Sequence, residues 1–260
     1  MGGFLAECLG VSQSGAAVLL LGMLAGFPIG ASAAAELYRE GGCDSREAQR
    51  LMPLSNHPSP AFVLAAGGTV FHSRTTALLL LTALYTATIW LVAMSGRKPP
   101  RSRRDGKENP EKTTVSLVSC FAGACVSAGR SMLLICAYVV FFGVITGFLP
   151  ENPLLRGIFE MTGGIYALSG QSGKTAVCAA FLLGFGGLCV AAQSMCFAEE
   201  AGLSMKRYLK LKLCQGTIAA VHMFAMIKLR YWAILLAFAE IGIVAVKNSG
   251  KKSENVLYSE

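Results

Sequence analysis

The segment Ser55-Asn56-His57-Pro58-Ser59-Pro60 decides how this chain can fold, because it interrupts a helical pattern. Helix-forming sequence precedes it over Asp44–Leu54 and follows it over Ala61–Phe71. Pro58 and Pro60 each lack an N–H donor and would clash one turn back in a helix, so the chain has to unwind here. The freed backbone groups need water in a soluble protein. In a membrane they need surrounding protein or a polar cavity.

The composition indicates a membrane protein. The 260 residues are 53% hydrophobic and 15% charged, with a mean hydropathy of +0.53. Thr75–Met94 and Ser131–Leu149 are uncharged runs of 20 and 19 residues, close to the roughly 20 helical residues that cross the hydrocarbon of a bilayer. Tyr231–Val246 is shorter and contains Glu240. We therefore predict an all-α polytopic membrane protein embedded in a lipid bilayer.

Several classes of site are not indicated. The three histidines and nine cysteines show neither Cys-x-x-Cys nor His-x-x-x-His spacing, so we expect no metal and no cofactor. Gly170–Thr175 ends like a phosphate loop, but Leu168 stands where that motif needs its first glycine. No pattern of residues suggests hydrolysis, so we expect no enzyme. The net charge of +8 lies largely in Arg97–Lys112 and Met205–Lys212, which is typical of membrane topology and not of nucleic-acid binding.

A shift of 158 residues matches part of the chain to itself, which we interpret as an internal repeat. Gly26-Phe27 falls on Gly184-Phe185, and each pair interrupts an apolar run. In the same register Ser55–Pro60 pairs with Gln215-Gly216 as a second interruption. Other matches are Gln13-Ser14-Gly15 with Gln171-Ser172-Gly173, Leu24 with Leu182, and Ala33-Ala34 with Ala191-Ala192.

The loops that correspond in this register differ in charge. Glu36–Arg50 carries three basic and four acidic side chains, whereas Met205–Lys212 carries four basic and no acidic ones. Because cytoplasmic loops are enriched in Lys and Arg, we expect the two loops on opposite sides of the membrane. The result is an inverted repeat with discontinuous, hairpin-like helices, which in transporters places the substrate near the midplane.

The predicted organisation has four parts. Residues 1–94 form the first repeat, 95–114 a basic cytoplasmic loop, 115–246 the second repeat with its preceding membrane helices, and 247–260 a polar tail. Within the second repeat we expect a short helix over Ser116–Arg130, a crossing helix over Ser131–Leu149 and a short helix over Leu154–Leu168.

Glu160 is the sharpest candidate for a functional residue. A carboxylate among apolar residues is costly in a bilayer, so it is usually paired, protonated or faces a cavity. The helix can open at Thr162-Gly163-Gly164, which follows closely, and expose backbone carbonyl groups. An ionised Glu160 beside this stretch could hold a coupling cation or proton. The alternative is a solvated carboxylate at the membrane surface. Glu7 precedes the first repeat in a similar way.

The other candidate residues lie at or near the interruptions. Asn56 and Ser59 could line a solute site or cap the freed backbone, and Gly186 and Gly187 would expose backbone groups at the second break. Gln193 could bind a ligand or a neighbouring helix. His57 could carry protons, and Arg130 could pair with an anion or extend to the membrane surface.

Seven stretches carry a resemblance to a known family. In chain order they are Gly26–Ala31, Ala35–Tyr38, Arg46–Leu51, Ser55–Leu64, Phe141–Val144, Glu160–Ile165 and Phe185–Val190. Together they resemble the nucleoside-recognition or gate-domain membrane proteins, specifically the sporulation integral membrane proteins of spore-forming Firmicutes. The resemblance covers nearly the whole chain. The ordered set of stretches is fairly specific, although no single stretch is.

The resemblance implies two gate-like repeats in the cytoplasmic membrane or the membrane around the forespore. It also implies transport of a small aromatic solute, either an anion similar to dipicolinate or a nucleoside. The competing interpretation is a structural or morphogenetic membrane protein of sporulation that transports nothing. His57 and Pro58 depart from the small or amide residues of the family. Nothing before Glu7 matches Ser116–Leu149, so we expect missing N-terminal membrane segments or a homo-oligomer.

These observations give an expectation about geometry. Ser55–Pro60 and Gly184–Gly187 should lie near each other at membrane depth, because unwound backbone in a bilayer must share a polar surrounding.

Overall fold

The computed structural model describes residues 2–95, 116–169, 174–229, 239 and 242. In these residues every regular element is a helix. The helices are α1 (Gly2–Leu9), α2 (Gln13–Ala25), α3 (Ile29–Arg39), α4 (Ser45–Ser55), α5 (Pro60–Phe71), α6 (Arg74–Ser95), α7 (Leu117–Gly147), α8 (Pro153–Phe159), α9 (Met161–Tyr166), α10 (Lys174–Phe185), α11 (Gly187–Glu200) and α12 (Tyr208–Leu229). The predicted basic loop, the Tyr231–Val246 helix and the polar tail lie almost wholly outside the described residues.

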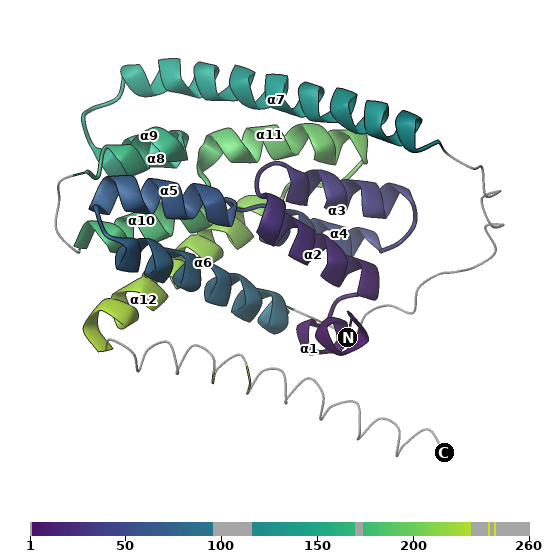
Figure 1. Cartoon of the computed structure of the whole chain (residues 1–260), viewed down its shortest axis with the longest axis horizontal. Coiled ribbons are helices and arrows are strands. Elements are labelled where there is room, and N and C mark those ends of the chain that lie inside the picture. Colours follow the sequence, from purple (N-terminus) through teal and green to yellow (C-terminus); the bar gives the residue numbers. More distant parts are fainter. Residues whose placement is uncertain (1, 96–115, 170–173, 230–238, 240–241, 243–260) are drawn as a thin grey trace.

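Three stretches are long and apolar enough to cross a membrane: α6, α7 and Thr175–Glu200, which covers α10 and α11. The fold class predicted from the sequence, an all-α chain with membrane-spanning helices, is therefore confirmed. The helix α7 runs along the outside of the bundle (Figure 1) and contains no buried residue.

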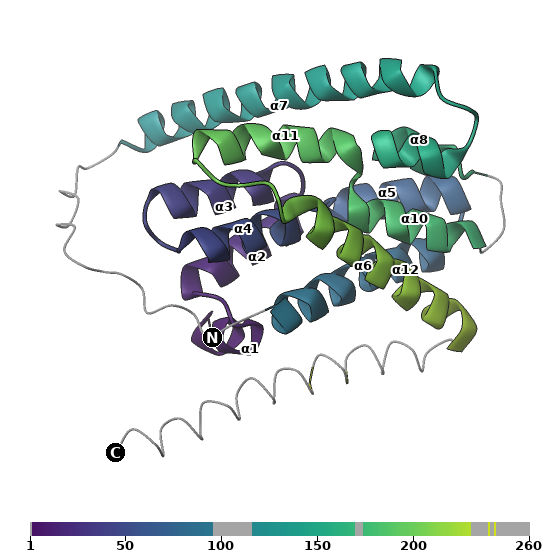
Figure 2. The ribbon, with the colours of Figure 1, turned by 180° about the vertical axis from the view of Figure 1, so that it is seen from behind.

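Two motifs interrupt the helical bundle. In the first, two helices form a hairpin: α3 packs against α2, and α9 packs against α8. In the second, a helix stops and another begins on the far side of a break. Here α4 and α5 lie on opposite sides of their break, and so do α10 and α11, in both views (Figures 1 and 2).

The breaks follow from local sequence. Ser59 caps α5, since its side chain accepts a hydrogen bond from the amide of Phe62 at 3.3 Å, and Pro60 takes the first position of the helix. The break before α11 has Gly186 at φ 81° and Gly187 at φ 79°. A side chain is strained in this left-handed region, so two glycines can turn the chain where other residues would continue the helix.

Three expectations about helix boundaries are wrong. Ser116–Arg130 and Ser131–Leu149 form one continuous helix, α7, because nothing between them breaks a helix. Leu154–Leu168 is two helices, since the backbone of Glu160 is extended at φ −134° and ψ 110°. Gln215-Gly216 lies inside α12, so it is not a second break. Tertiary packing tolerates this glycine within the helix.

The two loops predicted on opposite sides of the membrane both border one hydrophobic cluster, which Leu37 and Met205 pack against; their placement relative to the membrane stays a prediction. Glu36 and Arg39, at the end of α3, line one pocket with Glu200, at the end of α11. Leu37 belongs to the same hydrophobic cluster as Leu203.

The interior consists of two hydrophobic clusters. One packs α1–α4 against the second half of α6 and the end of α11. The other packs α5, the first half of α6, α9, α10 and α12. Met52 and Leu54 lie in the first cluster and Val63 in the second, so the Ser55–Pro60 break lies between them.

The second cluster depends on a close contact between α10 and α12. A Cβ atom built on Gly184 would lie 2.7 Å from the Cα of Gly216, and one built on Gly216 would lie 2.7 Å from the carbonyl oxygen of Phe181. We predict that Gly216→Val separates the two helices and costs about 1–3 kcal/mol of stability, as overpacking does.

The measurement is thermal unfolding of the purified protein in detergent, with Thr217→Val as control. Thr217 is exposed on the same helix, so the control introduces the same side chain without the clash. An unfolding midpoint of Gly216→Val equal to that of the control would show that the helices do not pack as described.

Candidate functional site

All four interruptions of the bundle meet at one place. At the turn of the α2–α3 hairpin, a Cβ atom on Gly26 would lie 2.7 Å from the amide nitrogen of Ser59, in the α4–α5 break. A Cβ atom on Gly186 would lie 3.5 Å from the ring of Phe27, and one on Gly187 would lie 3.3 Å from the amide nitrogen of Met161. The two hairpin turns and the two helix breaks therefore form one centre.

Asn56 connects the first break to the second half of the chain. Its side-chain nitrogen donates hydrogen bonds to Ser194 Oγ at 2.8 Å and to Tyr208 Oη at 3.0 Å. Ser194 and Tyr208 are themselves 2.9 Å apart, so the three side chains form a closed triangle. All three are buried. The first break is thus bonded to α11, the helix that begins at the second break, and to α12.

Lys212 lies at the same centre and is fully buried. Its Nζ donates to the backbone oxygen of Asn56 at 2.9 Å and to Gln215 Oε1 at 2.8 Å, and it lies 5.8 Å from the centre of the Phe27 ring. In the part of the chain that the structure describes, no carboxylate lies within ion-pair distance of this ammonium group. A buried cation held only by neutral oxygens is costly, since its charge is not compensated.

Gln215 extends the network to α6. Its Nε2 donates to Thr88 Oγ1 at 2.7 Å, and Thr88 donates to the backbone oxygen of Leu84 at 2.8 Å. Each of these polar groups is buried and has a partner, which is the usual condition for polar groups in an interior. Lys212 is therefore fixed in position by Asn56, in the break after α4, and by Gln215 of α12, which Thr88 of α6 holds in turn.

Two polar atoms at the centre are buried without a hydrogen-bond partner: Asn56 Oδ1 and His57 Nε2. His57 is fully buried, its Nδ1 lies 3.3 Å from the carbonyl oxygen of Pro58, and its ring packs against Tyr85 with 5.3 Å between the ring centres. Buried polar atoms normally find partners. These two atoms are therefore exceptions among the buried polar groups of the centre.

Glu160 caps α9 at the turn of the second hairpin. One carboxylate oxygen accepts from the amide of Thr162 at 2.8 Å and the other from the amide of Gly163 at 2.6 Å. The residue is buried, with 9% of its surface exposed, so the interpretation as a solvated surface carboxylate does not hold. The contribution of Thr162 to the cap is its backbone amide.

The remaining candidates divide into two groups. Ser59, Gly186 and Gly187 lie at the centre, whereas Gln193 is buried further along α11 and donates to Cys189 Sγ at 3.3 Å. Arg130 lies outside the centre and pairs with Glu200 at 3.1 Å. Glu7 belongs to α1, at the start of the bundle.

Sequence reasoning missed Lys212, Tyr208 and Ser194. The sequence predicts a basic loop over Met205–Lys212 that includes Lys212, but the helix α12 begins at Tyr208 and turns one face inward. The spacing from Tyr208 to Lys212 and then to Gln215 is four and three residues, which places all three on one helical face. Lys206, Arg207 and Lys210 are exposed. This spacing was the signal that could have identified the buried lysine.

Comparison with known proteins supports the resemblance. No family model matches the chain, and no solved structure matches it significantly. The chain is similar to the sporulation integral membrane protein YlbJ of Bacillus subtilis (strain 168), with 25% identity over 279 aligned positions that cover 88% of this chain and 68% of that protein. The predicted resemblance to sporulation integral membrane proteins is confirmed. With its apolar helices, the chain is an integral membrane protein.

The cap at Glu160 gives a prediction about stability. Glu160→Ala removes both hydrogen bonds to the start of α9 and should cost about 0.5–2 kcal/mol, the usual loss for a helix cap. Glu160→Gln keeps one acceptor oxygen and should lose less. Thermal unfolding in detergent measures both, with Glu151→Gln as the control at an exposed carboxylate. Equal midpoints for Glu160→Ala and the control would rule out a capping role.

Proposed function

We propose that this relative of a sporulation integral membrane protein transports a small anionic solute, which binds where the two hairpin turns meet the two helix breaks. The observation that carries the proposal is Lys212, a fully buried ammonium group without a carboxylate partner among the described residues. A bound anion would supply the missing negative charge. Ionisable residues inside membrane proteins commonly mark the path of a substrate or ion.

The helix ends around Lys212 also favour an anion. Three helices of eight or more residues begin at the centre: α3 after Pro28, α5 after Ser59, and α11 after Gly186. The first turn of a helix presents free N–H groups and a partial positive charge. Discontinuous helices of transporters use such ends to bind anionic groups of a substrate.

The opposite helix ends favour a coupling cation. The helices α2, α4, α8 and α10 all end at the same centre, so their last carbonyl oxygens carry partial negative charge there. In transporters, such carbonyl oxygens and C-terminal helix ends bind the coupling ion, Na⁺ or a proton. In this proposal Glu160 has two roles, capping α9 and contributing a negative charge beside a coupling cation.

We also propose that the two halves of the chain are inverted repeats, in a register different from the 158-residue shift. The first repeat is the α2–α3 hairpin, the interrupted helix α4–α5 and the continuous helix α6. The second is the α8–α9 hairpin, the interrupted helix α10–α11 and the continuous helix α12. In this register the turn at Gly26–Pro28 corresponds to Glu160, and the break at Asn56–Ser59 corresponds to Gly186.

The class of solute follows from the chemistry of the centre and from the family resemblance. Lys212 and the helix N-termini favour a carboxylate, and His57 Nε2, in the tautomer that carries its proton there, can donate to a ring nitrogen or to a second carboxylate. An aromatic dicarboxylate such as dipicolinate satisfies both conditions. A nucleoside would use the polar atoms but leave the ammonium group without a counter-charge, so we favour the anion.

A structural role in sporulation is the second candidate. The observation that favours it is the closed network of Asn56, Ser194, Tyr208, Lys212 and Gln215, in which the side chains bind one another. Such a network could hold the two halves together without passing a solute.

The test is uptake of radiolabelled dipicolinate into liposomes that contain the purified protein. Lys212→Met keeps the length of the side chain and removes its charge, so uptake should fall by at least tenfold. Lys210→Met is the matched control, since Lys210 is exposed two residues earlier on the same helix. Size-exclusion profiles like that of the parent would show that both variants fold.

Glu160→Gln in the same assay tests the coupling role. We expect it to reduce uptake without preventing insertion, because it removes the charge and keeps the size. Uptake by Lys212→Met equal to that by Lys210→Met would refute the anion site. No uptake by the parent protein, with the fold intact, would support the structural role.

A further inference from the structure

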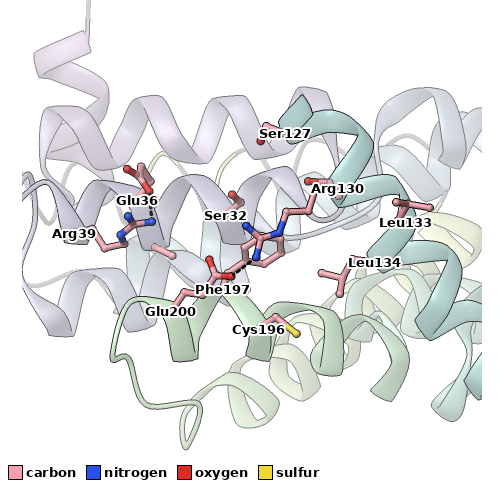
Figure 3. Close-up of a pocket in the computed structure, with 12 residues that line it drawn as sticks. Ser32, Glu36, Arg39, Ser127, Arg130, Leu133, Leu134, Cys196, Phe197 and Glu200 are labelled. Atoms are coloured by element: carbon pink, nitrogen blue, oxygen red, sulfur yellow. Dashed lines mark hydrogen bonds and ion pairs between the residues drawn. The ribbon is translucent and has the colours of Figure 1, made fainter. Parts of the chain in front are cut away.

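A pocket of about 630 Å³ lies between α3, α7 and α11, outside the centre described above (Figure 3). Its size is within the range of typical small-molecule sites. Its charged lining consists of Glu36 and Arg39 from α3, Arg130 from α7 and Glu200 from α11. The transport site proposed around Lys212 does not include this pocket.

The pocket surrounds the one charged side chain of α7. The 19 residues from Ser131 to Leu149 carry no charge and separate Arg130 from Glu151. The helix α7, Leu117–Gly147, is long and apolar enough over its whole length to cross a membrane. Arg130 is the one charged side chain in it, and the ends of α3 and α11 bring their charged residues beside it.

The charges in the pocket are held by weak ion pairs. Arg130 pairs with Glu200 at 3.1 Å, with side chains 82% and 49% exposed. Arg39 pairs with Glu36 at 2.9 Å, with side chains 53% and 51% exposed. Exposed pairs of this kind contribute little stability. A ligand that offers a phosphate and an ammonium group can replace each partner with an equivalent one.

One wall of the pocket is apolar and is formed in part by the outer helix α7. Leu133 and Leu134 of α7 and Phe197 of α11 line it (Figure 3). Because α7 has no buried residue, lipid chains can reach this wall from the side. A ligand with a charged end and an apolar chain fits both parts of the pocket.

We propose that this pocket binds a phospholipid with a zwitterionic headgroup, of the phosphatidylethanolamine type. The phosphate binds Arg39 and Arg130, the ammonium binds Glu36 and Glu200, and the start of an acyl chain packs on Leu133 and Phe197. The headgroup is zwitterionic because the two arginines and two glutamates sum to zero charge. A basic pocket would instead select an anionic headgroup.

The experiment is native mass spectrometry of the full chain with equal amounts of phosphatidylethanolamine and phosphatidylglycerol. The parent should retain phosphatidylethanolamine preferentially. The double variant Arg39→Gln/Arg130→Gln should bind it about tenfold more weakly, since hydrogen bonds to charged groups contribute that much. Arg46→Gln, at an exposed arginine outside the pocket, is the control and should bind as the parent does.

A second variant keeps the proposal testable if the first folds poorly. Glu36→Gln/Glu200→Gln leaves two arginines without counter-charges, so its preference should change to phosphatidylglycerol. Equal retention of both lipids by the parent, or no change of preference in this variant, would overturn the proposal. Full competition by soluble phosphoethanolamine at equal concentration would overturn the lipid assignment, since the acyl chain would then contribute nothing.

Discussion

The structure depends on one requirement: the backbone that unwinds at Asn56 must find hydrogen-bond partners inside the protein. The backbone oxygen of Asn56 accepts from Lys212, and the side chain of Asn56 binds Ser194 and Tyr208. These partners are 138 to 156 residues away in sequence. The partners that satisfy the first break therefore come from α11 and α12, and this requirement fixes how the two halves pack.

A cation is an unusual choice for this task. A serine or an amide could satisfy one carbonyl oxygen at a lower desolvation cost, because neutral donors lose less hydration when buried. Lys212 adds a charge that the described residues do not neutralise. Buried charges without partners are expensive, and a bound anion, as proposed above, would compensate this one.

The sequence predicted the helix breaks that arise from the backbone properties of proline and glycine. Pro58 and Pro60 identified one break, and the glycines at 186 and 187 identified another, since both residue types act through local geometry alone. The break at Glu160 was missed because a carboxylate breaks a helix only when it caps the next one, which depends on the turn geometry. The glycine at 216 was read as a break, but in the structure it permits close contact with α10 inside an intact helix.

The order of the chain has a consequence for biogenesis. When the ribosome has made α4 and α5, Lys212 and Ser194 have not yet been synthesised, so the polar groups at Asn56 enter the membrane without their final partners. Water, lipid headgroups or the insertion machinery must satisfy these groups until the chain has grown to Lys212, which lies 156 residues after Asn56. The packed centre can therefore form only after the second half has been inserted.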